Sequence, residues 1–366
     1  MTTTATDAAQ FRSRFPVLER LCYLNAGTEG PLPRRAAEAV RDRIELEAAQ
    51  GRCGRSYFES TIELAARARA AYAHLLGCSD AEVALTGSTT DGVNTVTAGL
   101  DLRAGDEIIT SDQEHPGLLA PLGRAARRHG LTIRLVPFAE LPGEIGPRTR
   151  LIACSHVSWV NGSVVDAASL ASSGVSVLLD GAQGLGAIPV DVHELGCDFY
   201  AASGQKWLCG PEGSGCLFVA PKRLEELSVP WPGYSSVADA QRALDSEPAE
   251  GVKRLDHGFP SGLRSTCALA SLEVFAAAGW PWVHERATSL AAWLADRLSE
   301  RGIEVQPRGR STLVSWRTED ATADVDRLAA EGVIVRSIPA FDFVRASVGA
   351  WSSEEELERL AELAAA

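Results

Sequence analysis

The sequence contains 366 residues, of which 45% are hydrophobic and 23% are charged, as is typical of a folded globular protein. A chain of this length is too long for one compact core, so we expect two domains or a large α/β domain with an appendage. The net charge of −13 leaves no basic surface to attract phosphates, which argues against a nucleic-acid partner.

Short apolar runs alternate with amphipathic segments through the first two thirds of the chain. The apolar runs predict strands at residues 83–86, 107–110, 132–136, 150–154, 176–179, 199–202 and 215–219. The amphipathic segments predict helices at residues 33–50, 58–76, 90–100 and 118–129. Because buried strands separated by helices are typical of a mostly parallel sheet covered on both faces, the sequence predicts an α/β fold.

After residue 262 the pattern changes. Long helices at 265–278 and 282–301 precede strands at 311–316, 333–337 and 344–348, and a capped terminal helix begins near residue 352. This pattern predicts a smaller α+β domain. We therefore divide the chain into an N-terminal segment that packs with the small domain (1–24), a large domain (25–262) and a small C-terminal domain (263–366). Residues 230–250, which are polar and contain several prolines, are expected to form a surface excursion.

Targeting segments and metal motifs are not indicated by the sequence. No apolar run approaches the roughly 20 residues of a membrane helix, and the N-terminus lacks the pattern of a signal peptide. The eight cysteines are scattered, without a Cys-x-x-Cys pair or a histidine at ligand spacing. We therefore expect no metal site, no disulfide framework, no membrane partner and a reducing, cytoplasmic location.

Lys206 is the residue that most strongly indicates a function. It ends a Ser-Gly-Gln-Lys turn after the predicted strand 199–202, and Asp180 ends the predicted strand before it. A strand-end lysine and a strand-end aspartate are the two groups that pyridoxal 5′-phosphate requires. The amine forms the Schiff base, and the carboxylate pairs with the pyridinium nitrogen. Of the three lysines, only Lys206 stands in such a context.

Polar residues at neighbouring strand ends complete a candidate cofactor site. The segment 86–90 lies between a strand and a helix, where hydroxyl and N–H groups can hold a phosphate. His115 follows the next strand, where an imidazole can stack on a cofactor ring and move protons. Gln183 is placed to reach the ring hydroxyl. The expected cofactor-binding residues are Ser88, Thr89, Thr90, His115, Asp180, Gln183, Ser203, Gln205 and Lys206, with Lys206, His115 and Asp180 as the catalytic ones.

Two arginines of the small domain are candidates to bind a substrate carboxylate. Arg336 and Arg345 flank the segment 337–344, and a guanidinium makes a two-pronged pair with the carboxylate that every amino-acid substrate carries. Asp342 is an alternative, purely structural partner for either arginine. A small-molecule substrate of the amino-acid class is therefore expected.

Taken together, the motifs resemble those of class V, fold type I pyridoxal-phosphate enzymes over nearly the whole chain. The resemblance is carried by residues 180–183 (Asp-Gly-Ala-Gln), 203–206 (Ser-Gly-Gln-Lys), 114–115 (Glu-His) and 344–347 (Val-Arg-Ala-Ser). The cysteine/cystine C–S lyase branch is resembled at residues 23–33, 206–211 and 336–345. The resemblance implies a homodimer with active sites at the subunit interface, and substrate contacts from Arg345, Arg336, Asn25 and Trp159.

The chain departs from the family pattern at three positions. The histidine that usually precedes the lysine is Gln205, and an asparagine common in the family is Trp159, as in the lyase branch. The threonine that reaches the neighbouring subunit's phosphate is Phe259, for which Ser261 is a candidate replacement. At these three positions the roles of the family's residues do not carry over to this sequence residue by residue.

Several reactions follow from a carbanion at Cα, and the sequence favours one of them. Cysteine desulfurases of this family use a loop cysteine between the two arginine positions, but residues 337–344 contain none. We therefore expect a lyase that cleaves the C–S bond of cysteine, cystine or a cysteine S-conjugate by α,β-elimination. A class V aminotransferase or an epimerase resembling isopenicillin N epimerase remains the alternative, and a non-catalytic cofactor-binding scaffold is a third hypothesis.

Overall fold

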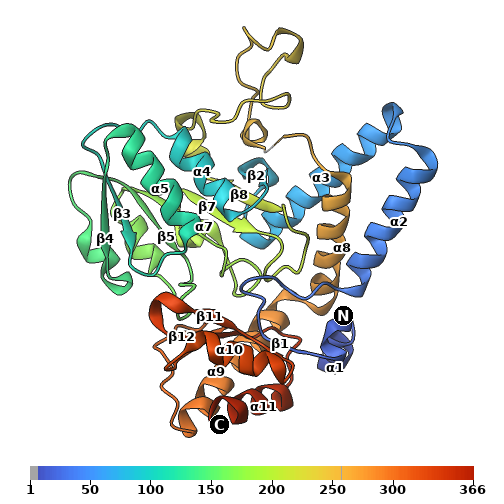
Figure 1. The fold of residues 1–366 in the computed structure, drawn as a ribbon. Helices are drawn as coiled ribbons and strands as arrows, with labels where there is room; N and C mark the ends of the chain where they lie inside the picture. Colours follow the sequence, from blue (N-terminus) through green and yellow to red (C-terminus); the bar gives the residue numbers. More distant parts are fainter. Residues whose placement is uncertain (1–6, 257) are drawn as a thin grey trace.

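The computed structural model describes residues 7–256 and 258–366, so the first six residues of the predicted N-terminal segment 1–24 lie outside the described residues. A seven-stranded sheet forms the centre of the larger part of the molecule (Figure 1). Its strands lie in the order β2-β8-β7-β6-β5-β3-β4; β8 pairs antiparallel with β2 and β7, and all the other pairs are parallel. The strands are β2 (Val83–Thr86), β3 (Glu107–Ser111), β4 (Thr132–Val136), β5 (Thr149–Ser155), β6 (Ser176–Asp180), β7 (Phe199–Ser203) and β8 (Gly215–Val219).

Both faces of the inner strands of this sheet are covered, which explains why these strands are apolar without alternation, whereas the edge strand β4 is partly exposed. One face packs against α3 (Gly54–Leu76), α6 (Ala167–Ala171) and α7 (Val192–Leu195), with Leu179 and Tyr200 in the shared core. The other face packs against α4 (Thr89–Gly99) and α5 (Pro116–His129), with Leu178 and Phe199 in the shared core. The predicted α/β architecture with a mostly parallel sheet is confirmed.

A smaller antiparallel sheet forms the second part of the molecule, with strands in the order β11-β12-β9. Its strands are β9 (Leu313–Arg317), β11 (Arg336–Ile338) and β12 (Phe343–Ser347). It packs with helices α9 (Trp280–Glu300), α10 (Ala321–Ala330) and α11 (Glu354–Ala364) around a separate apolar core. The predicted smaller α+β unit is thus present at the C-terminal end of the chain.

The N-terminal part of the chain joins this smaller unit. Strand β1 (Cys22–Tyr23) pairs in parallel with β10 (Val333–Ile334), and Arg12 of helix α1 (Ala8–Arg12) forms an ion pair with Glu356 of α11 at 2.6 Å. The segment 333–337 was predicted as one strand, and this prediction is wrong. Residues 333–334 pair with β1 whereas residues 336–338 pair with β12, so two different partners divide the segment.

The remaining elements lie around the two sheets. Helices α2 (Arg34–Gln50) and α3 form a long hairpin at one side, and α8 (Gly262–Ala278) packs against both (Figure 1). Residues 230–250 project from the molecule as the predicted excursion (Figure 1). Short 3-10 helices are η1 (Pro16–Glu19), η2 (Asp80–Glu82), η3 (Phe138–Glu144), η4 (Pro221–Glu226), η5 (Ala240–Arg242), η6 (Val252–Leu255) and η7 (Pro339–Phe341).

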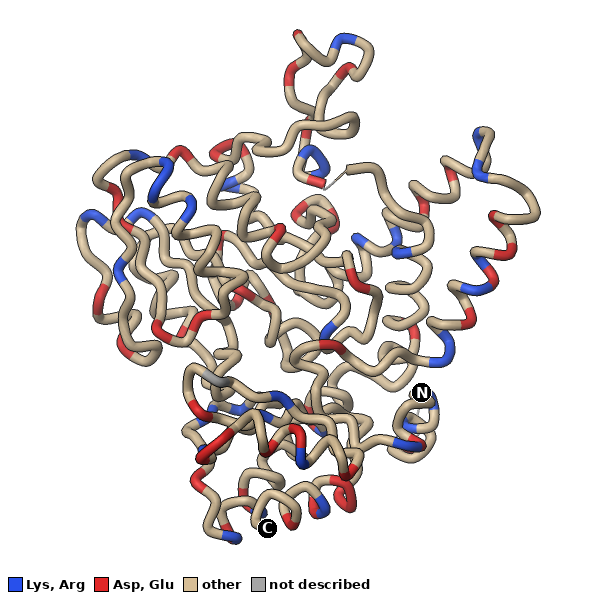
Figure 2. Tube along the Cα trace, viewed as in Figure 1, with Lys and Arg blue, Asp and Glu red and all other residues tan. Residues whose placement is uncertain are grey.

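Charged residues of both signs are interspersed along the surface helices (Figure 2). Among the helices that the structure describes, none combines the length and the hydropathy that a membrane crossing requires.

Candidate active site

The carboxyl ends of the parallel strands meet at one edge of the large sheet, and polar side chains end four of them. Ser111, Ser155, Asp180 and Ser203 are the last residues of β3, β5, β6 and β7. Ser155 lies directly opposite Asp180 in the register of the sheet. Open α/β sheets bind ligands at this edge, because the loops there leave a crevice above the strand ends.

A cavity of about 230 Å³ opens at this edge, where the small antiparallel sheet faces the large one. It is lined by twelve of the thirteen predicted site residues, namely Ser88, Thr89, Thr90, His115, Trp159, Asp180, Gln183, Ser203, Gln205, Lys206, Arg336 and Arg345. Four further residues line the cavity without having been predicted from the sequence, namely Gly27, Thr28, Ser155 and Ala182. Asn25 does not line the cavity, and its Oδ1 instead accepts a hydrogen bond from Thr28 at 2.8 Å.

The N-terminus of helix α4 forms one wall of the cavity. The Ser88 hydroxyl caps the helix by accepting from the N–H of Asp91 at 3.1 Å. The Ser203 hydroxyl accepts from the N–H of Thr89 at 3.1 Å and shares a 2.5 Å hydrogen bond with the Thr89 hydroxyl. This cluster of hydroxyl groups at the positive end of a helix is suited to hold a phosphate, as the sequence predicts.

Asp180 and Lys206 are the two charged groups at the floor of the cavity. The Asp180 carboxylate accepts from the N–H of Ala182 at 2.9 Å. Burial raises the pKa of Asp180, and the positive charge of Lys206 together with the Ala182 hydrogen bond partly offsets this rise. Burial lowers the pKa of Lys206 to about 8, against the opposing effect of Asp180. Lys206 can therefore exchange a proton near neutral pH.

His115 is held as a neutral imidazole. Its Nδ1 accepts from the N–H of Gly117 at 2.9 Å at the start of helix α5, so its proton lies on Nε2. Burial, followed by the nearby charges of Lys206 and the two arginines, lowers its pKa to about 4. The ring meets Trp159 edge-on, with the ring centres 4.8 Å apart.

Gln183 and Gln205 differ in whether other protein groups form hydrogen bonds with their side-chain amides. The Gln183 amide donates to the carbonyl of Gly27 at 2.8 Å and accepts from the Trp207 indole at 2.9 Å, so its orientation is fixed. A Cβ on Gly27 would lie 2.9 Å from Gln183 Oε1, which explains the glycine there. Gln205 Oε1, in contrast, is buried without a hydrogen-bond partner.

The two predicted arginines lie side by side, because Arg336 on β11 is the register partner of Arg345 on β12. Arg345 is completely buried, and its Nη1 donates to the carbonyl of Trp159 at 2.6 Å. Its Nε and Nη2 have no partner among the described residues. Burial, followed by the charge of Arg336, lowers its pKa to about 9. Arg336 donates to the Thr28 hydroxyl at 2.8 Å and lies over the Trp159 ring.

The unsatisfied groups around the cavity indicate what it accommodates. Arg345 keeps two free N–H groups, Trp159 keeps a free indole N–H, and Gln205 keeps a free amide oxygen, all of them buried. Buried polar groups without a partner are costly in a native protein unless a ligand satisfies them. With three cationic side chains and only Asp180 as an acidic one, the lining favours anionic ligands. A phosphorylated cofactor and a carboxylate substrate both fit this lining.

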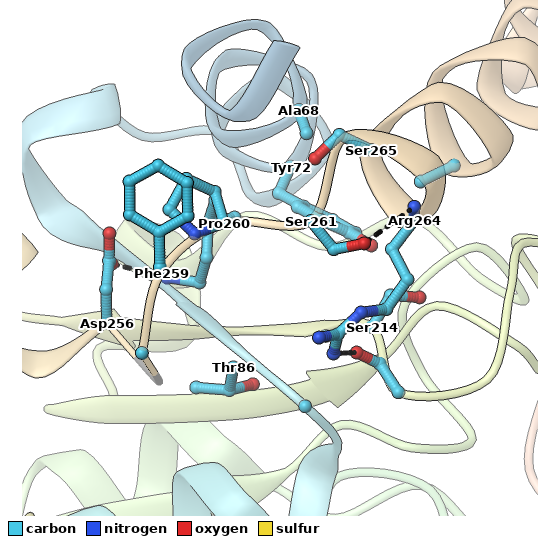
Figure 3. Close-up of a pocket in the computed structure, with 16 residues that line it drawn as sticks. Ala68, Tyr72, Thr86, Ser214, Asp256, Phe259, Pro260, Ser261, Arg264 and Ser265 are labelled. Atoms are coloured by element: carbon cyan, nitrogen blue, oxygen red, sulfur yellow. Dashed lines mark hydrogen bonds between the residues drawn. The ribbon is translucent and has the colours of Figure 1, made fainter. Parts of the chain in front are cut away.

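A second, smaller cavity of about 70 Å³ lies beside the N-terminus of helix α8 (Figure 3). Ser261 caps this helix by accepting from the N–H of Arg264 at 3.3 Å (Figure 3). Phe259 packs edge-on against Phe58 of α3, with the ring centres 6.0 Å apart. Neither Phe259 nor Ser261 lines the cavity that contains Lys206 within this chain.

No group of three His, Cys, Asp or Glu side chains within residues 7–256 and 258–366 is arranged to hold a metal ion.

Comparisons with known proteins relate the chain as a whole to a family. The family model described as aminotransferase class-V matches residues 22–360. Isopenicillin N epimerase of Streptomyces clavuligerus is 32% identical over 97% of both chains. Cysteine desulfurase CsdA of Escherichia coli is 33% identical over 81% of this chain and 78% of its own.

Solved structures give the same context. The cystine C–S lyase C-DES, in complex with its reaction product cysteine persulfide, superposes with a TM-score of 0.90 at 29% identity, covering 96% of this chain and 99% of its own. A lysine-to-alanine mutant of C-DES with glycine covalently linked to its PLP cofactor superposes with a TM-score of 0.91 at 28% identity, covering 97% of this chain and 98% of its own.

Proposed function

The chain belongs to the class-V aminotransferase family of fold type I enzymes, in its cysteine desulfurase-like branch, and from this premise we propose that it is a carbon–sulfur lyase. The reaction is the α,β-elimination of cysteine, cystine or a cysteine S-conjugate. The observation that carries the proposal is a cavity with one lysine and two adjacent arginines but no thiol among its lining residues.

The cofactor is pyridoxal 5′-phosphate, on which this family depends. When bound, it supplies an electron sink that stabilises negative charge at Cα of an amino acid. Ser88, Thr89 and Ser203 would hold its phosphate. Asp180 would pair with its ring nitrogen, and His115 would cover its ring.

Lys206 moves the proton in this proposal. Its amine, with a pKa lowered to about 8 by burial, takes the proton from Cα, and the C–S bond then breaks with its electron pair leaving on sulfur. The leaving sulfur departs as a thiol or a persulfide, and the released enamine hydrolyses to pyruvate and ammonia. No oxidant, reductant or second amino acid is required.

The arginine pair supports a substrate with more than one carboxylate. The free Nε and Nη2 of Arg345 match the two oxygens of one carboxylate. Arg336 lies beside it, and its contacts within the described part of the chain are with the neutral Thr28 hydroxyl and the Trp159 ring. Cystine, which carries a second carboxylate across its disulfide, uses both arginines, whereas cysteine requires only one of them.

A cysteine desulfurase is less well supported. That reaction requires a protein thiolate at the substrate sulfur, and all eight cysteines lie outside the cavity lining. Seven of the eight are buried or partly buried, and burial raises the pKa of Cys209, which follows Lys206 by three residues.

An epimerase is the second candidate, because isopenicillin N epimerase matches the chain over nearly its full length. Epimerisation needs a group that returns the proton to the opposite face of Cα. His115, whose pKa is lowered to about 4, remains neutral at physiological pH and is a weak acid for that task. This favours elimination over epimerisation.

We also infer a homodimer in a reducing, cytoplasmic compartment. Ile44, Phe58, Ile62 and Phe259 on or next to the α2–α3 hairpin are each about half exposed, which favours coverage by a second copy. The eight cysteines are all free, as is usual for proteins in reducing compartments. Sedimentation of the purified protein tests the dimer directly.

The deciding experiment measures pyruvate, sulfide and alanine released from L-cystine and L-cysteine. Elimination predicts pyruvate without added keto acid, whereas alanine indicates desulfuration and racemised substrate indicates epimerisation. Arg336→Ala is expected to reduce kcat/KM about tenfold for cystine and about twofold or less for cysteine. Arg317→Ala, an exposed arginine of the same small sheet, is the matched control. Equal losses on both substrates would exclude the two-carboxylate arrangement.

A further inference from the structure

Glu114, the residue before His115, is a buried carboxyl group that the proposed reaction does not use. The residue is 5% exposed. It accepts a hydrogen bond from the Ser111 hydroxyl at the end of β3. It also accepts from the Ser155 hydroxyl at 2.5 Å and from the Ser155 N–H at 2.9 Å, at the end of β5. Glu114 therefore ties together the ends of the neighbouring strands β3 and β5, and Ser155 at the end of β5 lines the cavity.

These bonds reach both sides of the candidate cofactor site. Ser155 lines the cavity and is the register partner of Asp180, and the backbone of His156 continues the contact by donating to the Asp180 carbonyl at 2.9 Å. On the other side, Glu114 is joined covalently to His115. A single carboxyl group thus connects the residue expected over the cofactor ring with the strand end beside the ring nitrogen's partner.

The charge on Glu114 decides how these hydrogen bonds run. As a carboxylate it can only accept, so both serine hydroxyls must donate to it, and Ser155 Oγ then presents its lone pairs to the cavity. As a neutral acid it must donate its own proton, and the only hydroxyl oxygens bonded to it are those of Ser111 and Ser155. One serine must then turn its proton elsewhere, which changes the polarity of the cavity wall.

We propose that Glu114 is a positioning residue of this active site, which in its ionised form fixes the Ser155 hydroxyl and the segment that carries His115. This inference rests on the proposed function for its catalytic consequence. Its structural consequence, a buried charge that orders two strand ends, does not depend on the reaction.

The ionised form has an energetic cost that can be measured. Burial raises the pKa of Glu114 from 4.5 to about 7. Hydrogen bonds from the two serines lower this pKa, and the negative charge of Asp180 raises it further. Among the other groups packed nearby, the Cys154 thiol is also influenced by Glu114, and burial raises its pKa well above the usual range, so it stays neutral. Because the folded protein holds this proton more tightly than the unfolded chain, stability is lost as the pH rises from 4.5 to about 7.

Glu107 provides a matched control on the same strand. It is a buried glutamate at the other end of β3, and its carboxylate likewise accepts from a hydroxyl on β5, that of Thr149 at 2.9 Å. Burial raises its pKa, but the bonds from Thr149 and Arg134 outweigh that effect, so the pKa lies below its ordinary value. Ionisation of Glu114 therefore costs stability between pH 4.5 and about 7, whereas ionisation of Glu107 adds stability only below pH 4.5.

The test compares Glu114→Gln with Glu107→Gln in the cofactor-loaded protein. Thermal unfolding at pH 5 and pH 8.5 is expected to show Glu114→Gln gaining stability relative to wild type as the pH rises, since it removes a buried charge. Glu107→Gln is expected to differ from wild type by nearly the same amount at both pH values, because the stability contributed by a carboxyl whose pKa lies below 4.5 is already present at pH 5. A Glu114→Gln stability difference that does not change with pH would overturn the proposal.

The catalytic readout is kcat and KM for L-cystine across the same pH range. At pH 8.5, Glu114→Gln is expected to reduce kcat about tenfold with KM changed less than about twofold, and the deficit is expected to shrink below pH 7. Glu107→Gln is expected to leave kcat within about twofold. A deficit that is the same at every pH, or that the Glu107 variant shares, contradicts a role for the ionised carboxylate. If wild-type protein turns over no amino acid, the proposed function fails, while the unfolding measurements still decide the role of Glu114.

Discussion

The two sides of the cavity are built on different principles. On the large-sheet side, Ser203 and Thr89 are hydrogen-bonded to each other, and Gln183 is bonded at both ends of its amide by the protein itself. On the small-sheet side, Arg345 is completely buried yet keeps two N–H groups without partners. Apart from the free Oε1 of Gln205 and the free indole N–H of Trp159, the large-sheet side is thus organised in advance, whereas the arginine on the other side retains unused donors.

This difference indicates which side binds a group that stays on the enzyme and which side binds a group that exchanges with every turnover. A cofactor that stays bound is held best by a rigid, internally bonded wall, because little ordering then remains to be done on binding. Unpartnered buried donors raise the free energy of the empty site, and this cost is removed when a bound carboxylate accepts their hydrogen bonds. The large-sheet side therefore suits the cofactor, and the arginine side suits the substrate.

Replacing Lys206 is expected to have the largest effect, and it tests whether the large-sheet side binds the cofactor. Lys206→Ala is expected to reduce turnover by at least about 10³-fold, because no other lysine lines the cavity. The purified variant is also expected to lack the borohydride-reducible yellow absorbance band. Lys222→Ala, which removes an exposed lysine paired with Asp198, is the control and is expected to behave as wild type. A yellow band that survives in the Lys206 variant would contradict the assignment of the cofactor side.

The cofactor side was the more predictable of the two from sequence. Asp180 and Lys206 stand at the ends of short apolar runs, and the edge of a parallel sheet brings such ends together without further information. The predicted sheet strands agree with the structure to within one or two residues for the same reason. Local patterns of hydropathy determine these elements.

The features that the sequence did not reveal depend on contacts between distant segments. The strand expected at 333–337 is divided because its first part pairs with β1, which lies more than 300 residues earlier in the chain. Gly27 and Thr28 line the cavity because their loop lies against Arg345 and Arg336. Ser155 was missed because a serine that ends a strand carries no special signal on its own. Such long-range pairings have no periodicity that a sequence pattern could show.

Replacing Arg345 tests the substrate side. Arg345→Ala is expected to lower kcat/KM about 10²-fold, mostly through KM, while the absorbance of the bound cofactor remains. Arg345→Lys is expected to recover little, because a lysine cannot make the two-pronged contact. Arg317→Ala on the neighbouring strand β9 serves as the control. If the Arg345 variants lost cofactor rather than substrate affinity, the division between the two sides would be wrong.

The pH dependence of cofactor uptake sharpens the comparison. Burial lowers the pKa of Lys206 to about 8, so the neutral, nucleophilic amine is a minor form at pH 7 and the major form at pH 9. The rate at which cofactor-free protein takes up pyridoxal 5′-phosphate is therefore expected to rise about tenfold over that range and then level off. Stopped-flow absorbance measures this rate. A rate still rising steeply above pH 9.5 would mean that Lys206 titrates as an ordinary exposed lysine.

The smallest expected effect concerns a helix cap far from the chemistry. Ser353 begins α11 with a capping box, in which its hydroxyl accepts from the N–H of Glu356 and the Glu356 carboxylate accepts from its N–H at 3.2 Å. Ser353→Ala is expected to destabilise the protein by about 1 kcal/mol, measured by thermal unfolding. Because Glu356 also bonds Arg12, the loss loosens the attachment of the N-terminal segment to the small unit. KM for the substrate is expected to stay within about twofold of wild type, since the arginines are anchored by their own sheet and not by this helix end. A large rise in KM would show instead that the substrate side depends on the packing of the whole C-terminal unit, whereas Ser353→Asp, which preserves the cap, should restore stability.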